Sequence, residues 1–199
     1  FIMFRKFSSI GSTICLLALT TVTSPGCALL GLEEEEEETT TVATGSLSDI
    51  EGTWLSSCLA NGSSYSQVTA EFSGTNQINT EISYSDSSCS SKRYTLIWTY
   101  NNLSAGAQST LTDGTSGYIF TAVAQTATWT PQDSSLLSAF NAGICGITSW
   151  QLNQATTVTG LDCGGNGNFQ PQGDVNYDKY AVSGSSLKLN NRNITLTKQ

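Results

Sequence analysis

Polar and apolar residues alternate along most of the chain after residue 47. This alternation is typical of β-strands that bury one face, and the intervals between apolar runs are rich in Gly, Ser, Asn and Asp, which favour turns. The clearest alternation covers residues 94–100, and in residues 78–84 the side chains of Ile78, Ile82 and Tyr84 share one face. Beyond these two segments, strands are predicted at residues 52–59, 68–72, 118–129, 148–153, 174–182, 187–190 and 194–197.

One helix is predicted at residues 131–142, because both of its ends carry recognisable signals. Thr130 can cap the N-terminus, Pro131 suits the first helical position, and Asp133 completes a capping box. Gly143 fits the position just past the C-terminus, where a left-handed backbone is needed.

The order of these elements predicts an all-β fold. About eight to nine short antiparallel strands with one packed helix favour a closed or nearly closed β-barrel, since closure removes exposed strand edges. A two-sheet β-sandwich is the alternative. Residues 103–117 and 160–173 are expected to form loops at the surface.

The first 26 residues resemble an export signal. Arg5 and Lys6 form a basic start, and residues 10–22 form an apolar segment too short to span a bilayer and be retained. Residues 24–27, Ser-Pro-Gly-Cys, resemble the lipobox of bacterial lipoproteins. That resemblance implies that Cys27 becomes the acylated N-terminus, while ordinary signal cleavage is the alternative.

Residues 27–46 are expected to form an acidic, disordered tether between a membrane and a folded domain. They include a run of glutamates at residues 33–38, whose charges repel one another and which cannot bury apolar area. Several acyl chains on one cysteine would hold the protein at a membrane almost permanently. Ala28 resembles the residue that follows the cysteine in lipoproteins passed on to the outer membrane, so we expect a lipid-anchored protein of the bacterial cell envelope.

Residues 47–199 are expected to fold as one domain with a single core. This segment has six basic and ten acidic side chains, a net charge of −4, and its Lys and Arg residues are scattered, so nucleic acid is not an expected partner. The chain has no histidine, which removes the commonest general base and zinc ligand. We therefore expect no enzyme, and no cofactor or metal site.

Four cysteines remain once Cys15 in the signal and Cys27 are set aside. An even number of cysteines in an exported domain predicts two disulfides. Of the three possible connectivities, sequential pairing closes the shorter loops and is preferred; a metal site would call for histidine or CxxC-like spacing, which are absent. The preferred pairs are Cys58 with Cys89, and Cys145 with Cys163.

Two motifs resemble the lipocalins and the wider calycin group. Gly52-Thr53-Trp54 is similar to their Gly-x-Trp opening, and residues 176–180 resemble their Asp-Tyr-x-x-Tyr segment. In that family a late arginine stacks over the first tryptophan at the closed end of the barrel. The resemblance therefore implies that Arg192 covers Trp54.

A second resemblance covers residues 52–58, 86–89 and 94–96. These segments are similar to the lipocalin-like barrels of the vertebrate glycoproteins called adenomatosis polyposis coli down-regulated. The resemblance concerns the framework of strands and cysteines, and it supports the Cys58–Cys89 pairing.

The larger aromatic side chains are candidates to line the barrel. An apolar lumen with a few hydroxyl groups would suit one small lipid or similar amphiphile; the alternative is that these residues fill the core. Asp174, Asn176 and Asp178 alternate in a manner that could serve calcium, but a solvated strand face is the favoured interpretation. The candidate ligand-binding residues are Tyr65, Phe72, Tyr84, Tyr94, Trp98 and Trp129.

Two functional hypotheses follow. In the first, the protein is a membrane-anchored lipoprotein that binds a small hydrophobic or amphiphilic ligand as a carrier or sensor. In the second, it is a structural or cell-contact surface lipoprotein with a filled core, whose loops face a protein partner that the sequence does not identify.

Overall fold

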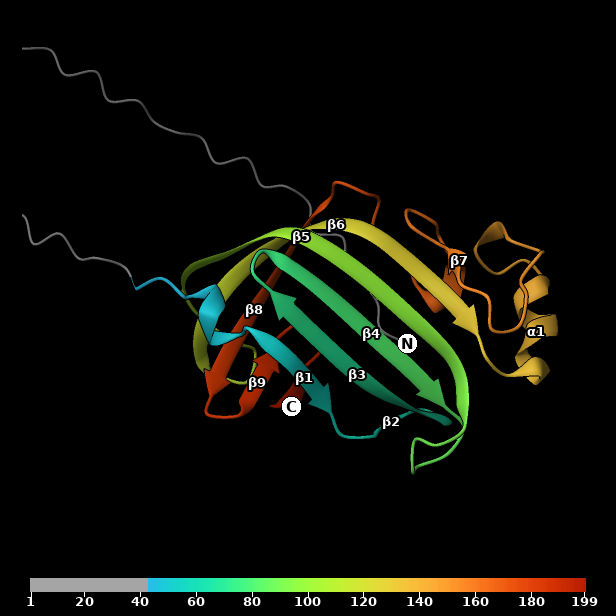
Figure 1. Cartoon of the computed structure of the whole chain (residues 1–199), viewed down its shortest axis with the longest axis horizontal. Helices are drawn as coiled ribbons and strands as arrows, with labels where there is room; N and C mark the ends of the chain where they lie inside the picture. Colours follow the sequence, from blue (N-terminus) through green and yellow to red (C-terminus); the bar gives the residue numbers. More distant parts are fainter. Residues whose placement is uncertain (1–42) are drawn as a thin grey trace, which may run out of the picture. The chain divides into compact units, whose positions relative to one another are not determined.

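The computed structural model describes residues 43–199 (Figure 1). The expected signal peptide, Cys27 and the run of glutamates lie outside the described residues. The described chain already contacts the barrel before residue 47, because Thr44 pairs with Ala107 and the backbone N–H of Gly45 donates to the carbonyl of Gly106 at 3.0 Å.

Ten strands and one α-helix make up the regular structure of residues 43–199. The helix α1 spans Ser134–Asn141, and short 3₁₀ helices cover Leu47–Asp49, Ile144–Gly146 and Gly164–Asn166. In this part of the chain no helix is both long and apolar enough to cross a membrane. The strands are β1 (Gly52–Ser56), β2 (Leu59–Asn61), β3 (Ser64–Ser73), β4 (Asn76–Tyr84), β5 (Lys92–Thr110), β6 (Ser116–Pro131), β7 (Thr156–Thr157), β8 (Val175–Ser183), β9 (Ser186–Leu189) and β10 (Ile194–Lys198).

The strands form a closed antiparallel barrel, which confirms the predicted fold class. The hydrogen-bonded order β1-β10-β9-β8-β6-β5-β4-β3 returns to β1 through the pairing of β1 with β3, so eight strands complete the ring. β2 adds to β3, and β7 adds to β6. The sandwich alternative is wrong, because a sandwich would leave β1 and β3 on unpaired edges.

The structure corrects two of the predicted segments. β5 continues to Thr110 and pairs with β6, so most of the loop expected at residues 103–117 is strand, and only the turn at 111–115 is irregular. Residues 148–153 form no strand. Trp150, which produced the apolar signal there, is 3 % exposed in a loop, and its ring N–H donates to the carbonyl of Ile147.

The start of the helix also differs from the prediction. Asp133, rather than Thr130, is the N-cap, and its carboxylate accepts a hydrogen bond from the backbone N–H of Ser135 at 2.8 Å. Pro131 ends β6 opposite Tyr94, because the pairing with β5 continues to that point. Gly143 has φ of 110°, which confirms the left-handed position just past the helix.

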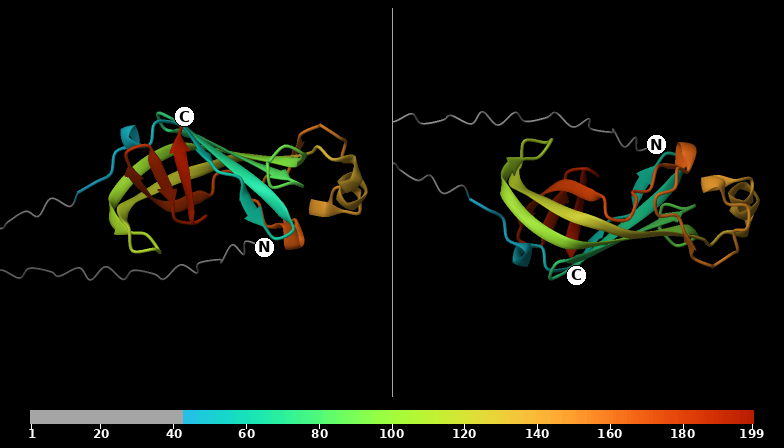
Figure 2. Two further views of the ribbon diagram at one scale, coloured as in Figure 1. Left: turned by 90° about the horizontal axis from the view of Figure 1, so that it is seen from below. Right: turned by 90° about the horizontal axis from the view of Figure 1, so that it is seen from above.

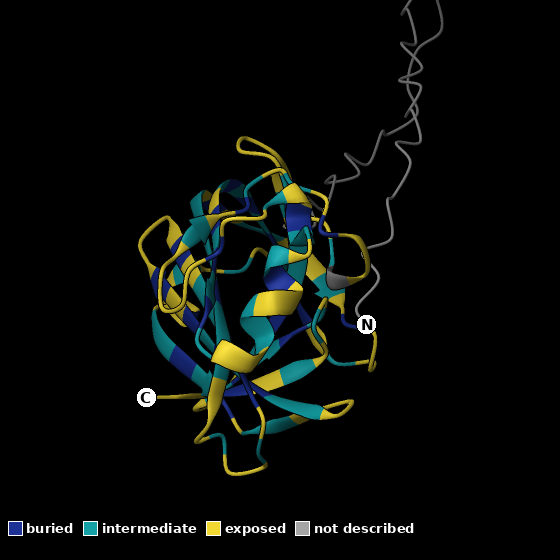
Figure 3. Ribbon diagram, turned by 90° about the vertical axis from the view of Figure 1, so that its right-hand side faces the viewer, coloured by how far each residue is buried: buried dark blue, intermediate teal, exposed yellow. Residues whose placement is uncertain are grey.

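Two hydrophobic cores share the inner face of the sheet. The barrel core includes Trp54, Phe72, Phe120, Tyr180 and several aliphatic side chains. The second core lies where β5 and β6 extend beyond the ring, and residues 132–174 supply its cover, which includes α1 (Figures 2 and 3). Its members include Leu96, Trp129, Phe140, Trp150 and Phe169.

Both preferred disulfides are present. Cys58, which follows β1, is bonded to Cys89 in the connection between β4 and β5, and Cys145 is bonded to Cys163 within the cover of the second core. The sequential pairing predicted from loop length is therefore confirmed.

Candidate functional site

The inner face of β4 is polar, although the strands on either side of it face inward with apolar residues. Cross-strand register places Glu81 between Val68 of β3 and Leu96 of β5, which belong to the barrel core and the second core respectively. In the same way Gln77 lies between Phe72 and Tyr100. The inner face of β4 therefore brings Glu81 between the two cores, while Gln77 lies among side chains of the barrel core, against which Tyr100 packs.

The register with β3 forces this orientation on β4. The tight turn at residues 73–76, in which Gly74 has φ of 56°, pairs Ser73 with Asn76 and fixes every later pair along the hairpin. A shift of one residue would exchange the two faces. Ile78 and Ile82 do share one face as predicted, but it is the outer one, and Ile78 is 40 % exposed.

A salt bridge crosses the interior from β4 to the turn between β9 and β10. The guanidinium Nη1 of Arg192 lies 2.8 Å from Oε2 of Glu81, and the two side chains are only 24 % and 15 % exposed. The same guanidinium lies over the ring of Trp98, with Cζ 4.8 Å from the centroid. Trp98 in turn stacks on Phe169, with centroids 6.2 Å apart and planes inclined by 25°.

Asp178 brings a second carboxylate to this region from β8. It pairs with Phe120 across the strands, so its side chain lies on the inner face, where it accepts hydrogen bonds from the backbone N–H groups of Lys179 at 2.7 Å and Asn191 at 2.9 Å. Burial raises its pKa to about 6, against the lowering effect of these hydrogen bonds and of Arg192. We call the set Gln77, Glu81, Trp98, Asp178 and Arg192 the junction site.

Gln77 leaves one polar atom of the junction site without a partner. The residue is 2 % exposed, and its amide Nε2 donates to Oδ1 of Asn79 at 2.9 Å. Its Oε1 is buried and has no hydrogen-bond donor. A buried acceptor without a donor is destabilising by about 1–3 kcal/mol, so a ligand that supplied a donor there would recover free energy.

Asp178→Asn is expected to gain stability over the wild type as the pH rises. The pKa of Asp178 is about 6 in the folded protein against an ordinary value of 3.8, so the folded state holds this proton more tightly than the unfolded chain. Between these two values the wild type therefore loses stability with rising pH, on the order of 3 kcal/mol in all, whereas the variant does not. Urea unfolding at several pH values from about 4 to 8 measures this difference, and a gap that is constant with pH would contradict it.

The six predicted ligand-binding residues do not line one lumen, which corrects that expectation. Phe72 lies in the barrel core. Tyr65 and Tyr84 are cross-strand partners near one end of β3 and β4 and belong to neither core. The other three lie in or against the second core: Tyr94, Trp98 and Trp129.

The expected contact between Arg192 and Trp54 is replaced by two others. Nζ of Lys198 lies 5.2 Å from the ring centroid of Trp54, while Arg192 covers Trp98. The reason is positional, because Lys198 is the cross-strand partner of Trp54 on β10, whereas Arg192 precedes that strand.

No protein-family model matches the chain, and no curated protein matches it. Function must therefore be inferred from the side chains themselves. In the described part of the chain, no three histidine, cysteine or carboxylate side chains come together in a way that could hold a metal ion. Asp178, considered above as a calcium ligand, accepts two backbone hydrogen bonds instead.

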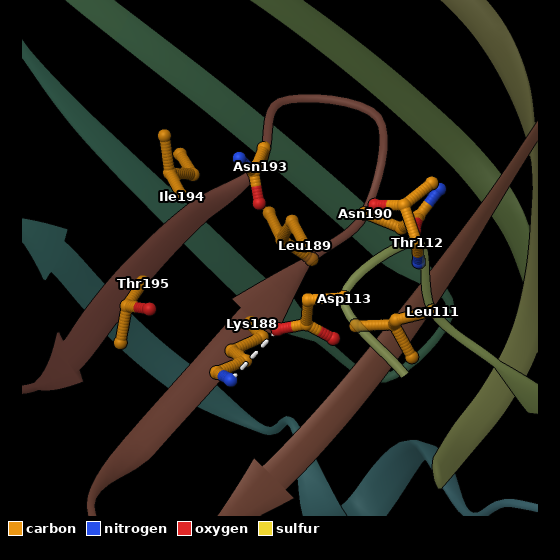
Figure 4. A pocket seen from close by; sticks show the side chains of 9 residues that line it. All are labelled: Leu111, Thr112, Asp113, Lys188, Leu189, Asn190, Asn193, Ile194 and Thr195. Carbon is orange, nitrogen blue, oxygen red and sulfur yellow. Dashed lines mark hydrogen bonds and ion pairs between the residues drawn. The ribbon is translucent and has the colours of Figure 1, made fainter. Parts of the chain in front are cut away.

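None of the junction-site residues lines either of two surface pockets. The first, of about 120 Å³, lies between the β5–β6 turn and the β9–β10 hairpin, where Lys188 and Asp113 form an ion pair of 2.9 Å (Figure 4). It has room for a few water molecules but not for an amphiphile. The second, of about 330 Å³, is more open and lies beside the Cys145–Cys163 disulfide; small side chains such as Ala139 and Ala142 line it.

The sequence did contain a signal for the junction site. In residues 76–83 the polar side chains of Gln77, Asn79 and Glu81 alternate as regularly as the isoleucines do. An alternation alone does not tell which face is buried. Only the register with β3 and β5 makes the polar set the inner one.

Proposed function

We propose that this protein is an envelope-anchored lipoprotein that binds a small amphiphilic ligand at the junction site. The observation that carries the proposal is the inverted strand β4, which places Gln77 and Glu81 inside the barrel while Ile78 faces solvent. Burying polar and charged groups costs free energy, and apolar side chains at these positions would stabilise the fold better. Buried polar side chains that destabilise the fold in this way are expected to contact a ligand.

The surroundings of the polar set favour a ligand with one apolar part. Trp98 and Phe169 present aromatic surface beside the ion pair of Glu81 and Arg192. Gln77 lies on the same strand face as Asn79, the cross-strand partner of Trp98. Trp54, Phe120 and Tyr180 already fill the barrel core, each at most 1 % exposed. The ligand is therefore expected to bind between the two cores rather than deep in the barrel.

The anchoring part of the proposal rests on Cys27 and on the cysteine pattern. Two disulfides in the described residues suit an oxidising compartment outside the cytoplasm. Acylation of Cys27 would hold the barrel at the envelope through the expected tether. The site then samples molecules in or near the membrane.

Fluorescence titration of the full chain in lipid nanodiscs tests the binding function. Three soluble hexyl amphiphiles serve as probes: one with a trimethylammonium group, one with a sulfate and one with a glucoside. We expect at least one of them to change the tryptophan emission saturably, and Trp98→Ala to abolish its binding. Empty nanodiscs report partition into lipid, and Tyr177→Ala, at a side chain that is 66 % exposed on β8, is the matched control. Saturation that is equal in the wild type and in Trp98→Ala contradicts the site.

A contact lipoprotein is the second candidate, and the filled barrel core favours it. Tyr177 and Val175 lie on the same face of β8 and are 66 % and 47 % exposed, an apolar pair that a protein partner could cover. Under this alternative none of the three probes binds. Chemical crosslinking from residue 177 in the intact envelope would instead capture a defined protein, and Tyr177→Ala would lose that product.

A further inference from the structure

We propose that the polar group of the ligand is cationic and that Arg192 is its intramolecular stand-in. The guanidinium occupies the place between Glu81 and Trp98 that the ligand's cation takes when Arg192 swings out. This inference rests on the proposed binding function and adds the charge of the ligand to it.

The contacts of Arg192 are those by which proteins recognise organic cations. A carboxylate oxygen lies 2.8 Å from Nη1, and an aromatic face lies 4.8 Å from Cζ. An aromatic face attracts a cation through its quadrupole, and the attraction grows when water is excluded. The Glu81 side chain is only 15 % exposed. Water therefore screens both the ion pair and the contact with the aromatic ring only weakly.

The charges around the site favour a cation over an anion. Glu81 from β4 and Asp178 from β8 face Arg192, and the hydroxyl of Tyr100 from β5 is close enough that both Arg192 and Asp178 affect its pKa. Burial is the main reason that the pKa of Tyr100 is raised, so this group is neutral. The described residues therefore place two carboxylates against one guanidinium. When Arg192 leaves, the remaining charge is negative.

The position of Arg192 on a short turn allows it to leave without breaking the sheet. It lies between Asn190 and Asn193, outside the ladder that begins with the pair Leu189 and Ile194. Asn191 and Asn193 are exposed. Asn190 and Asn193, which flank Arg192 and Asn191 in this turn, line the 120 Å³ pocket (Figure 4). A change of the Arg192 side chain, with a small shift of the turn, would open the site.

Buried Gln77 supplies the second observation that points to a ligand. Its Oε1 lies on the inner face of the same strand as Glu81, is buried, and has no donor. Arg192 pairs with Glu81 but leaves this acceptor unsatisfied. Gln77 and Glu81 are four residues apart on β4, about 13 Å at roughly 3.3 Å per residue. A ligand whose cation binds at Glu81 and whose separate hydroxyl or N–H group reaches Gln77 would satisfy this acceptor as well.

The test compares Arg192→Ala and Arg192→Lys with the wild type, in the full chain in nanodiscs and with the three hexyl probes. If Arg192 is a stand-in, only the fraction of molecules in which it has left can bind, so the apparent affinity of the wild type is reduced by that fraction. We expect Arg192→Ala to bind the trimethylammonium probe about tenfold more tightly than the wild type. Adding Glu81→Gln to that variant should remove the gain.

Lys188→Ala is the matched control, because Lys188 forms an ion pair on the same hairpin but with exposed Asp113, outside the junction site. Its affinity for the probe should equal that of the wild type. Thermal melts of each variant by circular dichroism confirm that the barrel is folded, and Arg192→Lys, which retains the charge, covers the case in which Arg192→Ala does not fold. It should bind the probe more tightly than the wild type, because an ammonium lacks the planar fork with which the guanidinium holds a carboxylate and an aromatic face.

The outcomes separate this inference from the proposed function. Tight binding of the sulfate probe by the wild type that is lost in Arg192→Ala would make Arg192 an anion anchor; it would overturn the inference and leave amphiphile binding intact. Equal affinity of all variants for the trimethylammonium probe would also overturn the inference. Failure of every probe with every folded variant would overturn the proposed function itself.

Discussion

Trp54→Ala is expected to lower the free energy of unfolding by about 4 kcal/mol, in the range measured for large-to-alanine changes in cores. Trp54 has no exposed surface and lies in the barrel core, where β3 and β10 flank its strand and close the ring. Its ring N–H donates to the carbonyl of Ile50 at 2.7 Å, so the alanine variant also leaves a buried acceptor without its donor. The loss is a large part of the stability of a domain of this size.

Urea unfolding followed by circular dichroism measures the effect, with Lys198→Ala as the control. Lys198 is exposed and contacts Trp54 only through the face of the ring at 5.2 Å, so its removal should cost no more than about 1 kcal/mol. If the Trp54 variant loses as little stability as the Lys198 variant, the buried indole does not stabilise the closed barrel as expected.

Removing the Cys58–Cys89 disulfide by a double change to alanine is expected to destabilise the protein by about 3–4 kcal/mol. The bond closes a loop of sequence separation 31, and it ties the end of β1 to the connection between β4 and β5. Without it the unfolded chain regains the freedom of that loop, which is the main source of the loss. Denaturant midpoints of the variant and the wild type measure the effect.

The Cys145–Cys163 double alanine variant is the matched comparison. Its loop is shorter, with a sequence separation of 18, so the loss from chain entropy should be slightly smaller. This bond lies in the cover of the second core, whereas Trp54 lies in the barrel core. We expect its loss to expose Trp129 and Trp150 to acrylamide quenching at denaturant concentrations at which the barrel is intact. An unchanged midpoint for both variants would contradict the role of the disulfides.

Both cores hold side chains of the junction site in place, so a loss of stability in either core should also affect the proposed ligand binding. Trp98 packs against the second core through Phe169, while Asp178 faces Phe120 of the barrel core. Damage to either core should therefore weaken ligand binding. This dependence is the reason that each binding variant needs its own melting curve.

Local sequence patterns were enough to predict most of the strands and the closed all-β fold. Alternation in residues 94–100 and 118–129 is a property of the strand itself, since successive side chains point to opposite faces. Cysteine pairing was also predictable, because short loops are easier to close. The helix was placed too early, because Pro131 suits both the first turn of a helix and the end of a strand.

Some local patterns are compatible with both a strand and a loop, and the sequence alone does not tell which of the two forms. Residues 148–153 are as apolar as a strand, but Trp150 fills the second core from a loop. The extension of β5 beyond Tyr100 has little apolar character, and its pairing with β6 holds it in the sheet. In both cases distant partners outweigh the local preference.

By itself, the sequence determined an all-β chain of alternating strands without histidine, and it favoured a barrel over a sandwich and two sequential disulfides, which the structure contains. The tertiary structure decided which face of β4 is buried, because the register with β3 and β5 is fixed by contacts that no single strand contains. It also brought Arg192 to Glu81 across 111 positions of the chain. A pairing so distant carries no local signal, since it depends on where the closed ring places the β9–β10 turn.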